Sequence, residues 1–173
     1  GGNYGPLDEY LRAQEFSDRA WTQYVTGASE MESVNIDRLN KRRATYEKYW
    51  RELIVNIRDV YVGPMSYAAN FDQFQEVGFW DALDVIGIQS YFPMSDKERP
   101  TERDIRKGWR ELMDRLGKYS KQHNRKILFT ELGYNQSWKA AKEPWDYRVD
   151  GEDARPLQEM CMRVALDVIK REP

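Results

Sequence analysis

The stretch KILFTELGY, residues 126–134, is an apolar run that ends at one glutamate, Glu131. Its centre, Ile127, Leu128 and Phe129, predicts a strand that is buried on both faces, as strands of parallel sheets are. Carboxylates are rarely buried without a partner. Glu131 is therefore either a group placed for chemistry or a structural carboxylate paired with an arginine from a neighbouring strand.

The composition is that of a globular protein and excludes several classes of function. The chain has 173 residues, and its net charge of −2 comes from interspersed acidic and basic residues, so no nucleic-acid partner is expected. No apolar stretch approaches the roughly 20 residues that span a bilayer, so no membrane span is expected. With one cysteine, Cys161, the chain has no internal disulfide, and with one histidine, His123, no Cys/His zinc cluster is expected. Carboxylates must carry any acid–base chemistry.

Hydrophobic periodicity predicts helices that alternate with strands. Helices are expected at 7–19, 37–59, 71–82 (short), 101–123 and 155–171, and strands at 21–27, 61–70, 84–92 and 126–134. Thr101 and Asp104 resemble a capping box at the start of one helix. Residues 135–153 form a long loop of the kind that often carries function. Strict alternation implies right-handed βαβ units and a parallel α/β sheet in a single domain, residues 1–173.

Each predicted strand ends in a polar or aromatic side chain: Glu30, Asn70, Tyr91 and Glu131. In a (β/α)₈ barrel the active site lies at the carboxyl ends of the strands, so these four would meet at one mouth. No glycine-rich dinucleotide or P-loop fingerprint follows any strand, which argues against a nucleotide-binding fold.

Two carboxylates at such a mouth suit glycoside hydrolysis. Tyr91 could orient a nucleophilic carboxylate, or it could be a core tyrosine. Three aromatic side chains near the last loop, Tyr134, Trp138 and Trp145, could stack on sugar rings, and the two tryptophans could instead pack the loop. Asn70 could contact substrate or serve as a turn or cap residue.

Five segments carry a family resemblance: ASEMES (28–33), SYAANFDQF (66–74), FWDALDVIGIQSYFPMS (79–95), ILFTELGYNQS (127–137) and PWDY (144–147). In this order they resemble the signatures of glycoside hydrolase family 113. That family is a clan A (β/α)₈ group known for β-1,4-mannanase activity. The second to fourth segments together make the resemblance specific, and the five cover nearly the whole chain.

The resemblance implies residue roles. Glu30 is similar to the acid/base at the end of the fourth barrel strand, and Glu131 to the nucleophile at the end of the seventh. Asn70 and Tyr91 resemble mouth residues of strands five and six. The family commonly reads Gly-Thr-Glu at the acid/base, whereas this chain reads Ala-Ser-Glu, which leaves Glu32 as a rival to Glu30. A retaining hydrolase of this kind needs no metal and no cofactor.

The expected fold is thus a partial (β/α)₈ barrel, strands four to seven with their helices, because a whole barrel needs roughly 250 residues. We expect the chain to be a segment of a longer protein, and a signal peptide upstream would put it outside the cytoplasm. The expected partner is a β-linked carbohydrate, with mannan as the default substrate. The alternatives are a non-catalytic carbohydrate-binding or scaffold protein and an unrelated four-stranded α/β domain.

Overall fold

The computed structural model describes residues 36–171, and contacts divide the chain into two compact units, residues 1–61 and 62–173. The described part of the first unit is helix α2, Ile36–Arg58. One side of the helix carries buried Ile54 and the edge-to-face pair of Tyr46 and Trp50, whose ring centroids are 6.0 Å apart. The amphipathic helix predicted at 37–59 is confirmed. The helix and strand predicted at 7–19 and 21–27 lie outside the described residues.

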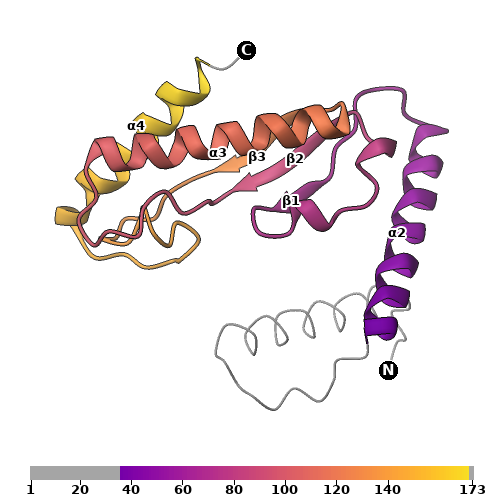
Figure 1. Cartoon of the computed structure of the whole chain (residues 1–173), viewed down its shortest axis with the longest axis horizontal. Helices are drawn as coiled ribbons and strands as arrows, with labels where there is room; N and C mark the ends of the chain where they lie inside the picture. The colour runs from indigo at the N-terminus through magenta and orange to yellow at the C-terminus, as the bar shows by residue number, and fades with distance from the viewer. Residues whose placement is uncertain (1–35, 172–173) are drawn as a thin grey trace. The chain divides into compact units, whose positions relative to one another are not determined.

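The second unit is built on a parallel sheet of three strands in the order β1-β2-β3 (Figure 1). The strands are β1 (Ala68–Asn70), β2 (Val85–Ser90) and β3 (Lys126–Leu132). Gly87 allows β2 to lie close to the preceding segment, because a Cβ there would be 2.4 Å from the carbonyl oxygen of Tyr67. The parallel arrangement predicted from the alternation of elements is confirmed.

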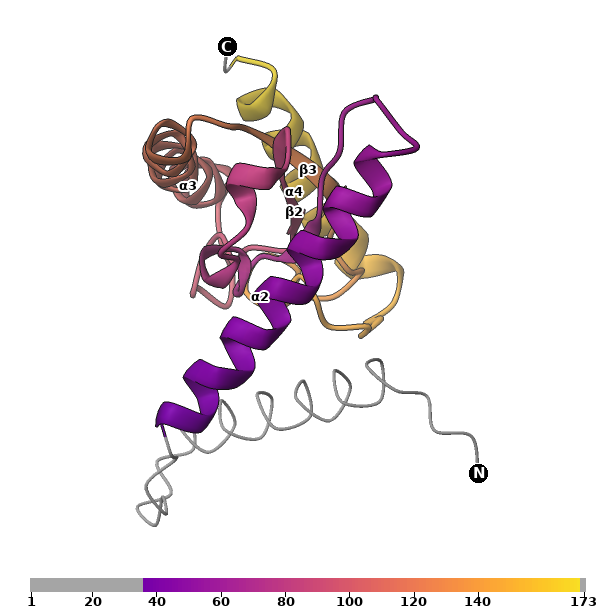
Figure 2. The ribbon, with the colours of Figure 1, turned by 90° about the vertical axis from the view of Figure 1, so that its right-hand side faces the viewer.

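Helix α3 (Glu102–His123) follows β2 and returns the chain to the start of β3 (Figure 2). It begins at the predicted capping box, in which the Thr101 side chain accepts from the Asp104 amide while the Asp104 side chain accepts from the Thr101 amide. It ends at Asn124, whose φ of 50° stops the helix in a left-handed conformation. Fully buried Trp109 packs edge-to-face on Phe129 of β3, so α3 covers one face of the sheet.

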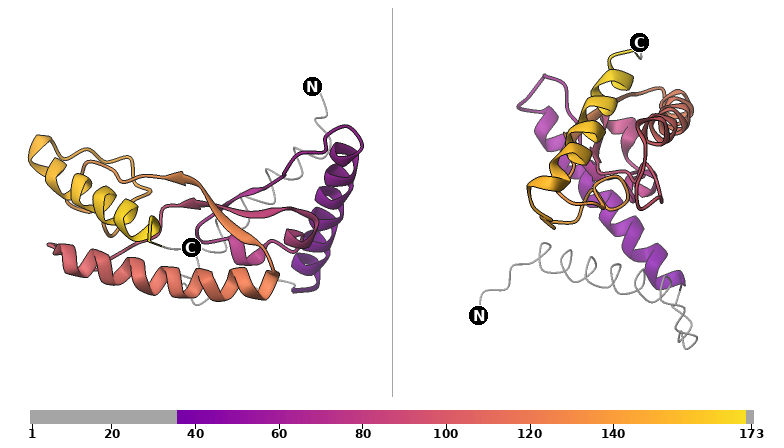
Figure 3. Two further views of the ribbon diagram at one scale, coloured as in Figure 1. Left: turned by 90° about the horizontal axis from the view of Figure 1, so that it is seen from above. Right: turned by 90° about the vertical axis from the view of Figure 1, so that its left-hand side faces the viewer.

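Helix α4 (Arg155–Ile169) packs against α3 (Figure 3). Its buried stripe consists of Leu157, Cys161, Val164, Ala165 and Val168. Three single-turn 3₁₀ helices complete the unit: η1 (Phe74–Glu76), η2 (Trp80–Ala82) and η3 (Glu152–Ala154). The short helix predicted at 71–82 is therefore two 3₁₀ turns, held together by the Trp80 indole N–H, which donates to the carbonyl oxygen of Phe74 at 2.9 Å.

Two strand predictions need correction. The strand expected at 61–70 is reduced to Ala68–Asn70, because Met65 N bonds the Asp84 carboxylate and Ser66 Oγ bonds the Val85 carbonyl in place of a regular ladder. The strand expected to be buried on both faces is half exposed, and Leu128 keeps 50% of its surface accessible. Among the described residues, β3 is an edge strand that pairs with β2 alone, and α3 covers the face that carries Phe129. No helix within residues 36–171 has the length and apolarity to cross a membrane.

Candidate active site

Glu131 lies near the carboxyl end of β3 with each carboxylate oxygen held by a side chain from β2 or the residue after it. The Gln89 amide Nε2 donates to Oε1 at 2.5 Å, and the Tyr91 hydroxyl donates to Oε2 at 2.9 Å. A carboxylate has about four lone-pair sites, so each oxygen retains one for a further interaction. The side chain of Glu131 is exposed and has no arginine partner among its described contacts, unlike the structural pairing considered above.

A β-bulge determines where Glu131 points. Ile88 is paired with Phe129, but the next residue of β2, Gln89, is paired with Glu131, so Thr130 has no opposite residue. Phe129 faces α3, and strict alternation would turn Glu131 to the same side. The extra residue brings Glu131 to the side of Gln89 instead, which is how bulges re-aim side chains near active sites.

The pKa of Tyr91 is raised above its ordinary value, chiefly because its hydroxyl donates a hydrogen bond to the Glu131 carboxylate. Partial burial and the negative charge of Glu131 act in the same direction, and a nearby ionised Tyr147 would add to them. An ionised phenol beside a carboxylate is unfavourable. Tyr91 therefore remains a neutral hydrogen-bond donor throughout the physiological pH range.

Asn70 occupies the matching position on β1. It is the last residue of that strand and is paired with Gln89, so Asn70, Gln89 and Glu131 form one row across the carboxyl ends of the three strands. Its side chain is exposed. Its backbone carbonyl oxygen accepts a hydrogen bond from the backbone N–H of Gln73 at 3.0 Å, and this bond starts a turn. The backbone of Asn70 thus has a turn role, and its exposed side chain is available to a ligand.

The long loop after β3 presents both of the expected tryptophans at the surface. Trp138 is 49% exposed, and its backbone N–H donates to the Asp150 carboxylate. Trp145 is 45% exposed and stacks on Phe71, just after β1, with ring centroids 5.2 Å apart. The stacking packs one part of the loop on the end of β1 while half of the indole surface remains in solvent.

Tyr134 differs from the two tryptophans. It is only 7% exposed, and its hydroxyl oxygen accepts a hydrogen bond from the Trp109 indole at 3.0 Å. Its backbone carbonyl accepts from Gln158 of α4, and burial raises the pKa of its hydroxyl. The expectation that this ring stacks on a sugar is therefore corrected, because the ring belongs to the core between β3, α3 and α4.

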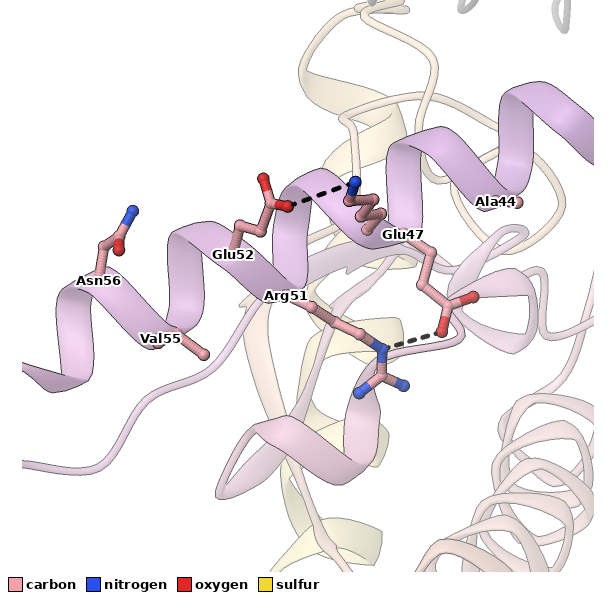
Figure 4. A pocket seen from close by; sticks show the side chains of 7 residues that line it. Ala44, Glu47, Arg51, Glu52, Val55 and Asn56 are labelled. Carbon is pink, nitrogen blue, oxygen red and sulfur yellow. Dashed lines mark hydrogen bonds and ion pairs between the residues drawn. The ribbon is translucent and has the colours of Figure 1, made fainter.

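The acid/base candidates Glu30 and Glu32 lie outside the described residues. Within residues 36–171, no group of three histidine, cysteine, aspartate or glutamate side chains is arranged to hold a metal ion. A surface hollow runs along one side of α2, lined by residues such as Glu47, Arg51 and Val55 (Figure 4). All of its lining residues belong to that helix, and none is a candidate site residue.

Most of the chain resembles one known protein family. The sequence profile of Glycoside Hydrolase Family 113 matches residues 25–173. The chain belongs to Glycoside Hydrolase Family 113. No protein with curated annotation matches it.

Solved structures of family 113 enzymes agree with the fold. A β-mannanase from Alicyclobacillus acidocaldarius in complex with ManMIm is 27% identical, with a TM-score of 0.60 over 75% of this chain and 37% of that one. A β-1,4-mannanase complex is 28% identical, with a TM-score of 0.59 over 73% and 37% of the two chains. A further β-1,4-mannanase structure is 29% identical, with a TM-score of 0.60 over 74% and 38%. This family 113 chain spans less than two fifths of the length of these relatives, and its fold is part of a (β/α)₈ barrel.

Sequence reasoning did not select two residues of this site. Gln89 looked like one more residue of an apolar strand, and only the register with β3 reveals that it contacts Glu131. Tyr147 ends the PWDY segment, is 98% exposed and lies close enough to Tyr91 to influence its pKa. Gln89 and Tyr147 both lie in the segments that resemble the family, but a sequence motif does not show which side chains contact each other in the fold.

Proposed function

We propose that this chain carries both catalytic carboxylates, Glu131 and Glu30, of a retaining glycoside hydrolase that cleaves β-mannan or a related β-linked glycan. Membership of family 113 supports the reaction class, and the mannanase activity of the solved relatives supports the substrate. The observation that carries the proposal is Glu131, exposed at the end of a barrel strand with both oxygens held by neutral donors. In a retaining mechanism, a carboxylate at the active-site mouth attacks the anomeric carbon, and these two donors hold Glu131 in place for that role.

In the proposed reaction, a Glu131 oxygen attacks the anomeric carbon as the glycosidic C–O bond breaks, and Glu30 gives its proton to the leaving oxygen. Water, deprotonated by Glu30, then attacks the same carbon and frees Glu131. This double displacement retains the configuration and places the two carboxyl groups about 5–5.5 Å apart. Neither step requires a metal ion or an organic cofactor.

Sugar binding in this proposal rests on Asn70, Trp138, Trp145 and the orienting residue Tyr91. Half-exposed indole rings can cover the apolar faces of pyranose rings. The exposed amide of Asn70, in one row with Gln89 and Glu131, can bond a sugar hydroxyl.

The test compares Glu131→Gln with Glu111→Gln in hydrolysis of β-1,4-mannan by the full chain. Glu111 is a surface residue of α3 paired with Lys107, and its replacement should leave kcat unchanged. Loss of the nucleophile should lower kcat by at least about 1,000-fold. Because Glu131 is exposed, its replacement should change unfolding free energy by less than about 1 kcal/mol. Sugar binding without hydrolysis by the unmodified chain would support the carbohydrate-binding alternative instead.

A further inference from the structure

Gln89 bonds one oxygen of the Glu131 carboxylate, and Tyr91 bonds the other. Its amide nitrogen is 2.5 Å from Oε1, whereas the Tyr91 hydroxyl is 2.9 Å from Oε2. A carboxylate held through one oxygen can still rotate about its last side-chain bond, because that torsion is broad. Donors on both oxygens restrict the rotation and define the plane of the group.

The β-bulge makes this contact possible. In a regular ladder Gln89 would be paired with Thr130, and Glu131 would turn toward the side of Phe129. The irregularity between Ile88 and Gln89 instead sets Gln89 directly opposite Glu131. The backbone irregularity and the side-chain hydrogen bond therefore act at the same residue pair.

We propose that Gln89 is a positioning residue that, together with Tyr91, fixes the carboxylate plane of Glu131 for attack on the anomeric carbon. The inference rests on the proposed function, since it assumes that Glu131 is the nucleophile. Gln89 donates a hydrogen bond to Glu131 and is assigned no proton transfer in the reaction. Its effect on the rate is therefore exerted through the position of Glu131. Misplacement of a reacting group by about 1 Å can cost around 100-fold in rate.

The test measures how fast a 2-fluoro-mannosyl fluoride labels Glu131 in the full chain and in three Gln89 variants. Gln89→Met keeps the length of the side chain but removes the donor, and should slow labelling about 10- to 100-fold, the range for loss of a hydrogen bond to a charged group. In mannan hydrolysis the same variant should lower kcat with KM within about threefold, because the bond matters at the reacting atom. Gln75→Met, at an exposed glutamine of η1, is the matched control and should label at the original rate.

Two further variants separate positioning from a structural role. Gln89→Asn keeps the amide on a shorter side chain and should restore part of the rate lost in Gln89→Met. Gln89→Glu sets a second carboxyl against Glu131, where like charges favour a shared proton. This variant should therefore have a higher kcat at acidic pH than at neutral pH, because repulsion between two carboxylates would displace Glu131.

Three results would overturn the proposal: an unchanged labelling rate in Gln89→Met, a loss confined to KM, or a pH profile of Gln89→Glu that matches the original. If the unmodified chain forms no adduct on Glu131, the proposed function itself fails, and this inference fails with it. The first set of results leaves Glu131 as nucleophile, so the two failures are distinguishable.

Discussion

Replacing Tyr134 with phenylalanine removes one hydroxyl from the core between β3, α3 and α4. The Trp109 indole N–H donates to that hydroxyl at 3.0 Å, and Trp109 is fully buried. In the variant the N–H has no partner and no access to water, which costs about 1–3 kcal/mol of unfolding free energy. With a urea m value of about 2 kcal/mol/M, the unfolding midpoint should fall by roughly 0.5–1.5 M.

Tyr147→Phe, in the loop that follows Tyr134, provides a matched control. Tyr147 is 98% exposed, so loss of its hydroxyl should change the unfolding free energy by less than about 0.5 kcal/mol. Urea unfolding followed by tryptophan fluorescence compares the two variants directly. An unchanged midpoint for Tyr134→Phe, combined with a higher KM for mannan, would refute the core assignment and return Tyr134 to the sugar-binding surface.

Three further predictions concern titration, capping and thiol reactivity. Glu131→Gln should lower the pKa of Tyr91 toward its ordinary value, as measured by NMR of ¹³Cζ-labelled tyrosine. Because the pKa of Tyr91 is higher in the folded than in the unfolded protein, its hydrogen bond stabilises the fold at neutral pH. That stabilisation is lost as pH rises through the folded pKa. A pKa of Tyr91 that stays the same in the variant would contradict the contact. Thr101→Ala removes the side-chain acceptor of the α3 capping box and should cost about 1 kcal/mol in urea unfolding, whereas no loss would mean that the cap is replaced by water. Burial raises the pKa of the Cys161 thiol to about 12, so Ellman's reagent at pH 8 should react with it only after unfolding, and rapid reaction in the folded protein would contradict its burial.

Much of the fold could be predicted because local signals determine it. The apolar faces of α2, α3 and α4 recur at helical spacing, and the capping box at Thr101 begins α3 where the motif indicates. The burial of β3 could not be predicted in the same way. Its apolar run resembles a strand with two covered faces, yet coverage depends on which neighbours are present.

The site could be predicted as a set of strand ends but not as a set of contacts. The sequence predicts Asn70, Tyr91 and Glu131 as site residues, because each follows an apolar strand. The pairing of Glu131 with Gln89 depends on a one-residue bulge, a feature of register between distant segments that no local pattern encodes. The position of Tyr134 likewise depends on a distant segment. Its side chain lies in the core, where the Trp109 indole of α3 donates a hydrogen bond to its hydroxyl.

The most direct test of the central claim is identification of the residue that a slow glycosyl substrate labels. The full chain is incubated with 2-deoxy-2-fluoro-mannosyl and 2-deoxy-2-fluoro-glucosyl fluorides, and the adduct is located by peptide mass spectrometry. A nucleophile at Glu131 predicts one covalent sugar on the peptide that contains KILFTELGY, absent from the Glu131→Gln variant. An adduct on another carboxylate, or no adduct with either sugar, would contradict the account.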